Sequence, residues 1–193
     1  MKILLIIIIS LSITNYSNAD NVKDFQIEEI SLYDSALKHF SKTKIDNSPK
    51  VAYIDKTYTS SGFDSQKFQT YDSINITYKT NDEKYIIVDI VGNIYMDYKE
   101  CMKEIKKINS EFDELFPNAK KAKLATYKHL ADKSGNSKIS DILWKFKSKD
   151  LIVLACYDWS SQMNKKKGWP DTLRISISSK EANNFFSSNP YKS

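Results

Sequence analysis

Two pairs of short segments constrain the fold more than any other feature of the chain. In the first pair, Ile74, Ile76 and Tyr78 alternate with polar residues, and residues 85–91 follow a polar turn as a segment rich in β-branched side chains. In the second pair, residues 142–146 alternate and residues 151–157 form an apolar run. Because a period of two places successive side chains on opposite faces of a strand, both pairs predict β-hairpins.

A helix is predicted after each hairpin. The first spans about residues 98–116, where an apolar stripe recurs at steps of three and four residues: Met102, Ile105, Ile108, Phe112 and Leu115. A shorter helix is expected over residues 158–166. A last strand is expected around Leu173–Ile177, and the capping-box pair Ser178 and Glu181 predicts a final helix to about Phe186.

This order predicts an α+β fold with an antiparallel sheet of hairpins and helices packed mainly on one face. The repeated order of strand, strand and helix fits either two similar halves or chance. Weaker patterns predict a strand at 25–30, a helix capped by Asp34, a polar loop at 43–50, a turn at 60–62 and a bulge or bend at Gly92. Residues 119–131 fit either a helix or a strand.

The first nineteen residues have the order of a secretory signal. Lys2 precedes the apolar stretch 3–13, and Ser17 and Ala19 supply the small residues that a signal peptidase reads. This stretch is shorter than the roughly 20 apolar residues of a bilayer-spanning helix. We therefore predict cleavage after residue 19, a single domain over residues 20–193 that does not span a membrane, and a periplasmic or secreted location. The abundance of Lys, Ile, Asn and Ser is typical of an AT-rich bacterial genome.

The two cysteines, Cys101 and Cys156, would then meet an oxidising compartment. Export favours a disulfide between them, and the alternative is two buried apolar thiols on a helix and a strand.

Charge is distributed unevenly along the mature chain. Residues 20–118 contain 13 lysines and 18 Asp or Glu, whereas residues 119–193 contain 14 lysines, Arg174 and 6 Asp or Glu. The basic half is either a solvated lysine-rich face or a patch for anionic partners such as lipid headgroups. Because export is predicted, nucleic acid is a poor candidate as the partner of the basic half.

Known catalytic patterns are missing from the sequence. The four glycines are too scattered for a phosphate-binding loop, and no nucleophile elbow, Cys-x-x-Cys pair or zinc helix occurs. We therefore expect no metal site and no cofactor, and we lean against an enzyme. His39 and His129 are the two side chains suited to acid–base chemistry near neutral pH.

The most individual segment lies near the C-terminus. It supplies the candidate ligand-binding residues, which are Asp158, Trp159, Trp169, Asp171 and Arg174. A guanidinium holds a carboxylate in a two-pronged geometry, and the tryptophans could wall a site for a small anionic or sugar-like ligand. The alternative is structural: Arg174, on the face opposite Leu173 and Ile175, forms an ion pair with Asp158 or Asp171.

Three stretches carry a resemblance: residues 30–37, 156–160 and 173–177. On them the chain resembles small exported proteins of AT-rich marine bacteria, a class with no established activity. Tyr33 stands where a glycine is more typical of that class. The resemblance implies export and a compact domain.

Together these patterns predict an exported, non-enzymatic binding or interaction protein whose basic half engages an anionic envelope component or a protein. One alternative is a small periplasmic hydrolase that uses a carboxylate with His129 or His39. Another is an envelope assembly accessory whose sheet edge receives a further chain.

Overall fold

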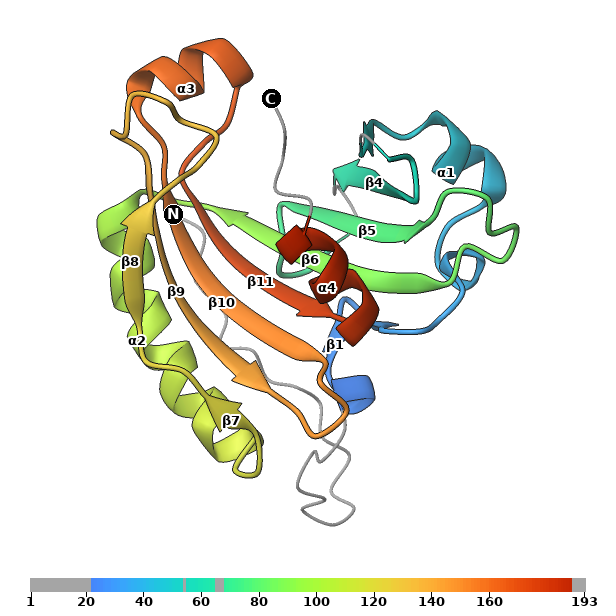
Figure 1. Ribbon diagram of the computed structural model, residues 1–193, viewed down its shortest axis with the longest axis horizontal. Coiled ribbons are helices and arrows are strands. Elements are labelled where there is room, and N and C mark those ends of the chain that lie inside the picture. Colours follow the sequence, from blue (N-terminus) through green and yellow to red (C-terminus); the bar gives the residue numbers. More distant parts are fainter. Residues whose placement is uncertain (1–21, 54, 65–67, 189–193) are drawn as a thin grey trace.

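The computed structural model describes residues 22–53, 55–64 and 68–188 (Figure 1). The predicted signal peptide lies outside these residues. The helical elements are η1 (Val22–Asp24), η2 (Ala36–Lys38), α1 (Lys42–Asn47), α2 (Tyr98–Leu115), α3 (Ser161–Lys167) and α4 (Lys180–Ser188). The strands are β1 (Gln26–Ile27), β2 (Ile30–Ser31), β3 (Lys50–Ala52), β4 (Tyr58–Asp64), β5 (Ser73–Lys79), β6 (Ile87–Tyr95), β7 (Lys120–Lys121), β8 (Ala125–Lys128), β9 (Lys138–Lys145), β10 (Leu151–Asp158) and β11 (Thr172–Ser178).

Nine of the strands form one antiparallel sheet. Its order is β3-β4-β5-β6-β11-β10-β9-β7, and β8 pairs with β9 beside β7. The acidic half of the chain supplies β3 to β6 and the basic half supplies β7 to β11, so the halves meet where β6 pairs with β11. One sheet therefore runs through both halves. The other two strands, β1 and β2, form a separate small hairpin.

Helix α2 covers one face of the sheet with the predicted apolar stripe. Its buried residues include Ile105, Ile108 and Phe112, which belong to the main core with the inward side chains of β9 to β11. The sulfur atoms of Cys101 and Cys156 lie 1.96 Å apart, so the predicted pair stands at disulfide-bonding distance and joins α2 to β10. This link holds the helix against the centre of the sheet.

Helix α4 lies on the opposite face (Figure 1). Its Ala182 and Phe185 form a second apolar cluster with Tyr58 and Val88. Val88 is the extra residue of a bulge in β6, where the pairing with β5 shifts after Thr77. The α+β class and the antiparallel sheet are confirmed. Packing of the helices mainly on one face is not, because the apolar side chains around Val88 need a cover of their own.

The two predicted strand–strand–helix units differ in their helices. Hairpin β5–β6 leads into α2, which has 18 residues and packs along the sheet. Hairpin β9–β10 leads into α3, which has 7 residues and lies beyond the end of the strands (Figure 1).

Glycine positions show how tertiary contacts overrode local turn patterns. No bulge lies at Gly92, which pairs in regular register with Ile74 and Ile175 in mid-sheet. A Cβ atom at Gly92 would lie 2.4 Å from ring carbons of Tyr71, so the absence of a side chain makes room for that ring. Gly62 lies inside β4 instead of in the predicted turn.

The N-terminal region also departs from the predicted elements. The expected strand at 25–30 is the β1–β2 hairpin, and residues 43–47 of the expected polar loop belong to α1. Ser35 caps η2 in place of Asp34. Tyr33 adopts a φ of 71°, and its hydroxyl donates to Asp150 Oδ1 at 2.9 Å, so the tight turn forms without a glycine.

The ambiguous basic segment forms the edge strands β7 and β8. One more residue separates Lys121 from Ala125 than separates their partners on β9, so this edge is bulged. Lysines on a bulged edge oppose unwanted pairing with other chains. No described helix has the length and apolar character that crossing a membrane requires.

Candidate functional site

The sheet face opposite α2 carries a row of mostly polar side chains. In the strand register, Asp141, Ala155, Arg174, Asn93 and Ser73 lie beside one another from β9 to β5. Helix α4 covers one end of this face, and α3 with the loop between β8 and β9 stands at the other end (Figure 1). We call the uncovered part around Arg174 the polar face.

Arg174 is held at the centre of the polar face by two neighbours. Its guanidinium carbon lies 4.2 Å from the centroid of the Tyr157 ring, and its Nε donates to Asn93 Oδ1 at 3.0 Å. The amide of Asn93 donates in turn to Ser73 Oγ at 3.2 Å and to Asn75 Oδ1 at 3.1 Å, which sets its orientation. The ring contact and the hydrogen bond from Nε fix the plane of the guanidinium. Its other nitrogens are therefore pre-organised to bind a carboxylate or phosphate.

The predicted ion pair between Arg174 and Asp158 or Asp171 does not form. Asp158 pairs with Lys138, with 3.2 Å between Oδ2 and Nζ. Asp171 Oδ1 accepts the backbone N–H of Trp159 at 2.7 Å. Among the described residues, none of the ion pairs includes Arg174. The two aspartates therefore hold the loops that flank the site.

One buried carboxyl group acts on Arg174 from a distance. Asp89 lies beneath α4 and accepts hydrogen bonds from Ser178 and Thr77. Burial raises the pKa of Asp89 to about 6, while the Ser178 bond and the charge of Arg174 oppose that rise. Asp89 therefore marks the closed end of the polar face.

Aromatic rings form a wall at the open end. Trp159 lies 4.6 Å from Trp169 and 4.3 Å from His129 between ring centroids, and Tyr157 stacks beside it at 5.8 Å. The structure thus brings Trp159, Trp169 and Arg174 to one end of the sheet. Sequence reasoning did not assign Tyr157, Asn93 and His129 to this site. Only the Tyr-Asp-Trp stretch itself could have suggested Tyr157.

His129 is held as a neutral side chain. Burial lowers its pKa, the charge of Arg174 lowers it further, and Asp132 opposes both. Its Nδ1 accepts the backbone N–H of Ala131 at 3.0 Å, which leaves the proton on Nε2. His39 lies elsewhere, 3.4 Å from Asp34. The two histidines therefore do not share a site.

The loop of residues 129–137 is tied down by one carboxylate. Asp132 accepts hydrogen bonds from the backbone and hydroxyl of Ser134, from both groups of Ser137, and from the hydroxyl of Ser160. These bonds, led by the one from Ser137, hold the pKa of Asp132 well below its usual range. The network fixes the loop, and with it His129, against the start of α3.

We expect Asp132→Asn to loosen this loop. The amide loses the charge that the five donors face, so amide hydrogen exchange at Ser137 and Ser160 should accelerate by about tenfold or more at neutral pH. Because the folded pKa is depressed, the difference from wild type should be complete above the usual aspartate pKa and shrink as the pH falls below it. The exposed change Asp64→Asn is the matched control, and equal exchange in all three proteins would contradict the role of Asp132.

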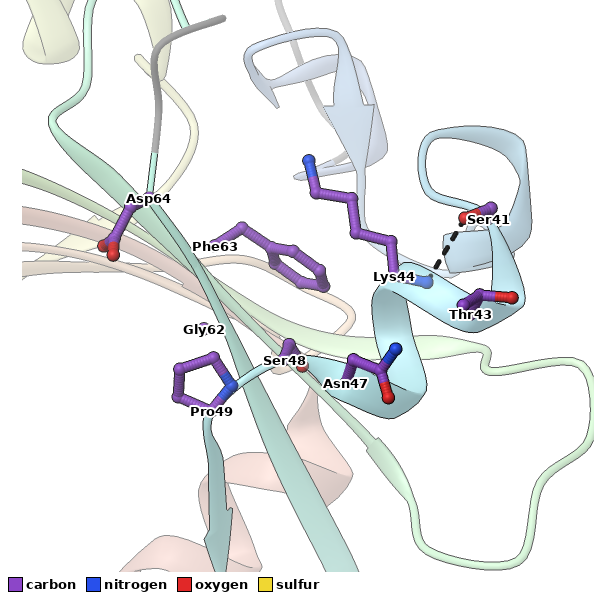
Figure 2. A pocket seen from close by; sticks show the side chains of 9 residues that line it. All are labelled: Ser41, Thr43, Lys44, Asn47, Ser48, Pro49, Gly62, Phe63 and Asp64. Carbon is purple, nitrogen blue, oxygen red and sulfur yellow. Dashed lines mark hydrogen bonds between the residues drawn. The ribbon is translucent and has the colours of Figure 1, made fainter.

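Two hollows lie away from the polar face. The first, of about 410 Å³, lies between α1 and β4 (Figure 2) and is lined by Ser41, Thr43, Lys44, Asn47, Ser48, Pro49, Gly62, Phe63 and Asp64. The second, of about 420 Å³, lies between α2 and residues 121–124. Neither is lined by Arg174 or the aromatic wall.

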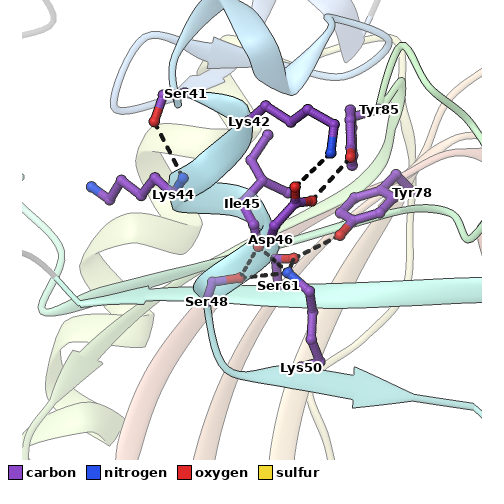
Figure 3. Close-up of polar contacts among 10 residues, drawn as sticks. All are labelled: Ser41, Lys42, Lys44, Ile45, Asp46, Ser48, Lys50, Ser61, Tyr78 and Tyr85. Carbon is purple, nitrogen blue, oxygen red and sulfur yellow. Dashed lines mark hydrogen bonds and ion pairs between the residues drawn. The ribbon is translucent and has the colours of Figure 1, made fainter.

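The surroundings of the first hollow have a structural role. Figure 3 shows Lys50 reaching from β3 toward the end of α1, where its Nζ donates to Ser48 Oγ at 2.8 Å, to Ser61 Oγ at 2.9 Å and to the carbonyl of Ile45. Burial lowers the pKa of Lys50. All three ammonium protons are engaged, so Lys50 joins α1 to the sheet and offers no donor to a ligand.

Comparison with known proteins assigns no family. No protein-family model, no curated protein and no solved structure matches the chain. In the described part of the chain, no three His, Cys, Asp or Glu side chains are grouped so that they could hold a metal ion.

Proposed function

We propose that this chain is an exported binding protein whose polar face recognises an anionic group. The observation that carries the proposal is the setting of Arg174. Its guanidinium is stacked on Tyr157 and anchored by Asn93, and it contacts no carboxylate of the described residues. A charge that is pre-organised but not neutralised by a contact is suited to an anion that arrives from outside.

We infer that the ligand is extended. Small molecules are usually enclosed by concave pockets, and neither of the two hollows described above includes Arg174 or the aromatic wall. Ser73, Asn93 and Arg174 form a row across β5, β6 and β11. The Trp159 ring stacks beside Tyr157, whose ring contacts the Arg174 guanidinium. This combination suits a polymer that carries carboxylate or phosphate groups.

Two alternatives have weaker support. A hydrolase would need a histidine paired with an available carboxylate. Nδ1 of His129 accepts a backbone N–H, and Asp132 is saturated by serine donors. His39 lies beside Asp34, but that carboxylate is already paired with Lys38. An assembly accessory would need an open sheet edge. Within the described residues β8 pairs only with β9, but the lysines along that edge oppose strand addition.

The test is binding of a model polyanion by the mature protein. Polygalacturonate carries a carboxylate on each sugar, and neutral dextran is its uncharged counterpart. Wild type should bind polygalacturonate and ignore dextran, as measured by calorimetry and by the fluorescence of Trp159. Arg174→Gln should weaken this binding by about tenfold to a hundredfold, because it removes a charged hydrogen-bonding partner.

Lys145→Gln is the matched control, since Lys145 is an exposed cation on β9 that pairs with Leu151, away from Arg174. Equal losses in both variants would indicate attraction by overall charge and not by the polar face. Absence of binding to polygalacturonate, to a sulfated polymer and to inorganic polyphosphate would contradict the proposal.

A further inference from the structure

A rigid loop holds one leucine almost fully in solvent. Leu130 is 85% exposed, and the other exposed large apolar side chains of the described residues are no more than 49% exposed. A single exposed leucine is ordinary on a mobile loop. Here its neighbours are fixed by hydrogen bonds. The backbone N–H of Ala131 donates to Nδ1 of His129, and the backbone N–H of His129 donates to the carbonyl of Ser137. The carboxylate of Asp132 accepts from the serine hydroxyls. The loop therefore presents Leu130 at little cost in conformational entropy.

A tryptophan lies at the same end of the sheet. Trp169 follows α3 and is 36% exposed. Its ring packs on Trp159, which packs on His129, the neighbour of Leu130. Figure 1 shows α3 beside the loop that connects β8 and β9. An apolar leucine and an amphipathic tryptophan thus stand on two adjacent, connected loops.

Cations surround these two side chains. Five exposed lysines lie on the same two segments and form no ion pair within the described residues: Lys128, Lys133, Lys165, Lys166 and Lys167. The three aspartates of these segments are already occupied, by serine donors, by Lys138 and by the Trp159 backbone. Only Asp158 is neutralised by a lysine, and the hydrogen bonds to Asp132 and Asp171 come from neutral donors. The five lysines outnumber these two carboxylates, so this end keeps a net positive charge.

We propose that this end of the molecule docks on a bilayer that contains anionic lipids. Leu130 and Trp169 enter the headgroup region, and the lysines lie against the lipid phosphates. Tryptophan is favoured at the membrane interface, leucine gains from leaving water, and each basic residue near an anionic surface adds attraction. The positive charge of the lysines favours a bilayer with anionic lipids over a neutral bilayer. Trp169 belongs to both surfaces, but Leu130 and the five lysines lie outside the set that holds Arg174, so the docking end goes beyond the anion recognition proposed for the polar face.

Sedimentation with sucrose-loaded vesicles tests the proposal. The mature protein should bind vesicles of phosphatidylglycerol and phosphatidylethanolamine at about 0.05 M salt, and about 0.5 M salt should release it by shortening the Debye length. Binding to phosphatidylcholine vesicles should be weaker by about tenfold or more. Leu130→Asp should weaken binding to the anionic vesicles by about tenfold, and so should the triple change of Lys165, Lys166 and Lys167 to Gln. Brominated lipids should quench the tryptophan fluorescence of wild type more than that of the variant Trp169→Phe.

Matched variants separate this site from the rest of the molecule. Leu124→Asp replaces another exposed leucine, and changing Lys99, Lys103 and Lys106 to Gln removes three cations from α2; both should bind as wild type does. Arg174→Gln should also bind vesicles normally, even if it loses polygalacturonate. The proposal is wrong if wild type does not bind anionic vesicles at low salt, if it binds neutral vesicles equally, or if Arg174→Gln abolishes vesicle binding while Leu130→Asp does not.

Discussion

Removal of the Cys101–Cys156 bond should lower the free energy of unfolding by about 4 kcal/mol, the figure expected when a loop of this length is opened in the unfolded chain. The bond spans a sequence separation of 55 residues and joins α2 to the buried strand β10. Both cysteines are fully buried, so their replacement by alanine also removes apolar contacts in the core. Urea unfolding of wild type and of the double variant Cys101→Ala, Cys156→Ala measures the difference.

Reduction provides the control for this first prediction. Dithiothreitol should destabilise wild type by a similar amount and leave the double variant unchanged, because the variant has no bond to reduce. A loss below about 1 kcal/mol in both comparisons would mean that packing of α2, and not the covalent link, holds the helix on the sheet.

Gly92→Ala should destabilise the protein by about 2–3 kcal/mol, at the upper end of the cost of overpacking a well-filled core. The added methyl group would meet the ring of Tyr71, whose nearest carbons lie 2.4 Å from the Cβ position. Tyr71 is buried and β6 is paired on both sides, so neither the ring nor the backbone can move freely. Equilibrium unfolding in urea measures the loss.

Two comparisons make this second prediction specific. In a Tyr71→Ala background, Gly92→Ala should cost much less, which a double-mutant cycle detects as coupling between the two sites. Gly62→Ala is the matched glycine control. Its Cβ would lie 3.1 Å from the Asn75 amide nitrogen and 3.8 Å from the Pro49 carbonyl oxygen, which is a milder overlap, so a smaller effect is expected there. Equal costs at the two glycines would contradict the role of the Tyr71 ring.

Strong periodicity predicted the elements that dominate the fold. The stripe from Met102 to Leu115 predicted α2 to within a residue. The alternating segments predicted β5, β9 and β11, and the apolar run predicted β10. Predictions that rested on a single polar side chain were wrong. Ser178 was expected to cap the last helix, but its hydroxyl donates to Asp89, and Ser179 accepts the backbone N–H of Ala182 in its place. A cap depends on a single side chain, and a tertiary partner can redirect it.

The candidate site was predicted in part. Trp159, Trp169 and Arg174 lie close together, as expected, because short loops connect β10, α3 and β11. Asn93 could not be predicted as the anchor of Arg174, since the two residues are 81 positions apart and meet only through the β6–β11 pairing. Asp158 and Asp171 were assigned to ligand binding on residue type alone, and the structure uses them to hold the flanking loops.

The amino-acid sequence by itself determined the strands of the two hairpins, the last strand, the long helix and the face on which Arg174 lies, because these follow from spacing along one segment. Only the tertiary structure decided which strands are neighbours. It placed β11 between β6 and β10, and this order stacks Arg174 on Tyr157, gives it Asn93 as a partner and leaves both aspartates to other tasks. Periodicity reports which side of an element is buried, but contacts between distant segments are chosen by the packing of the whole sheet.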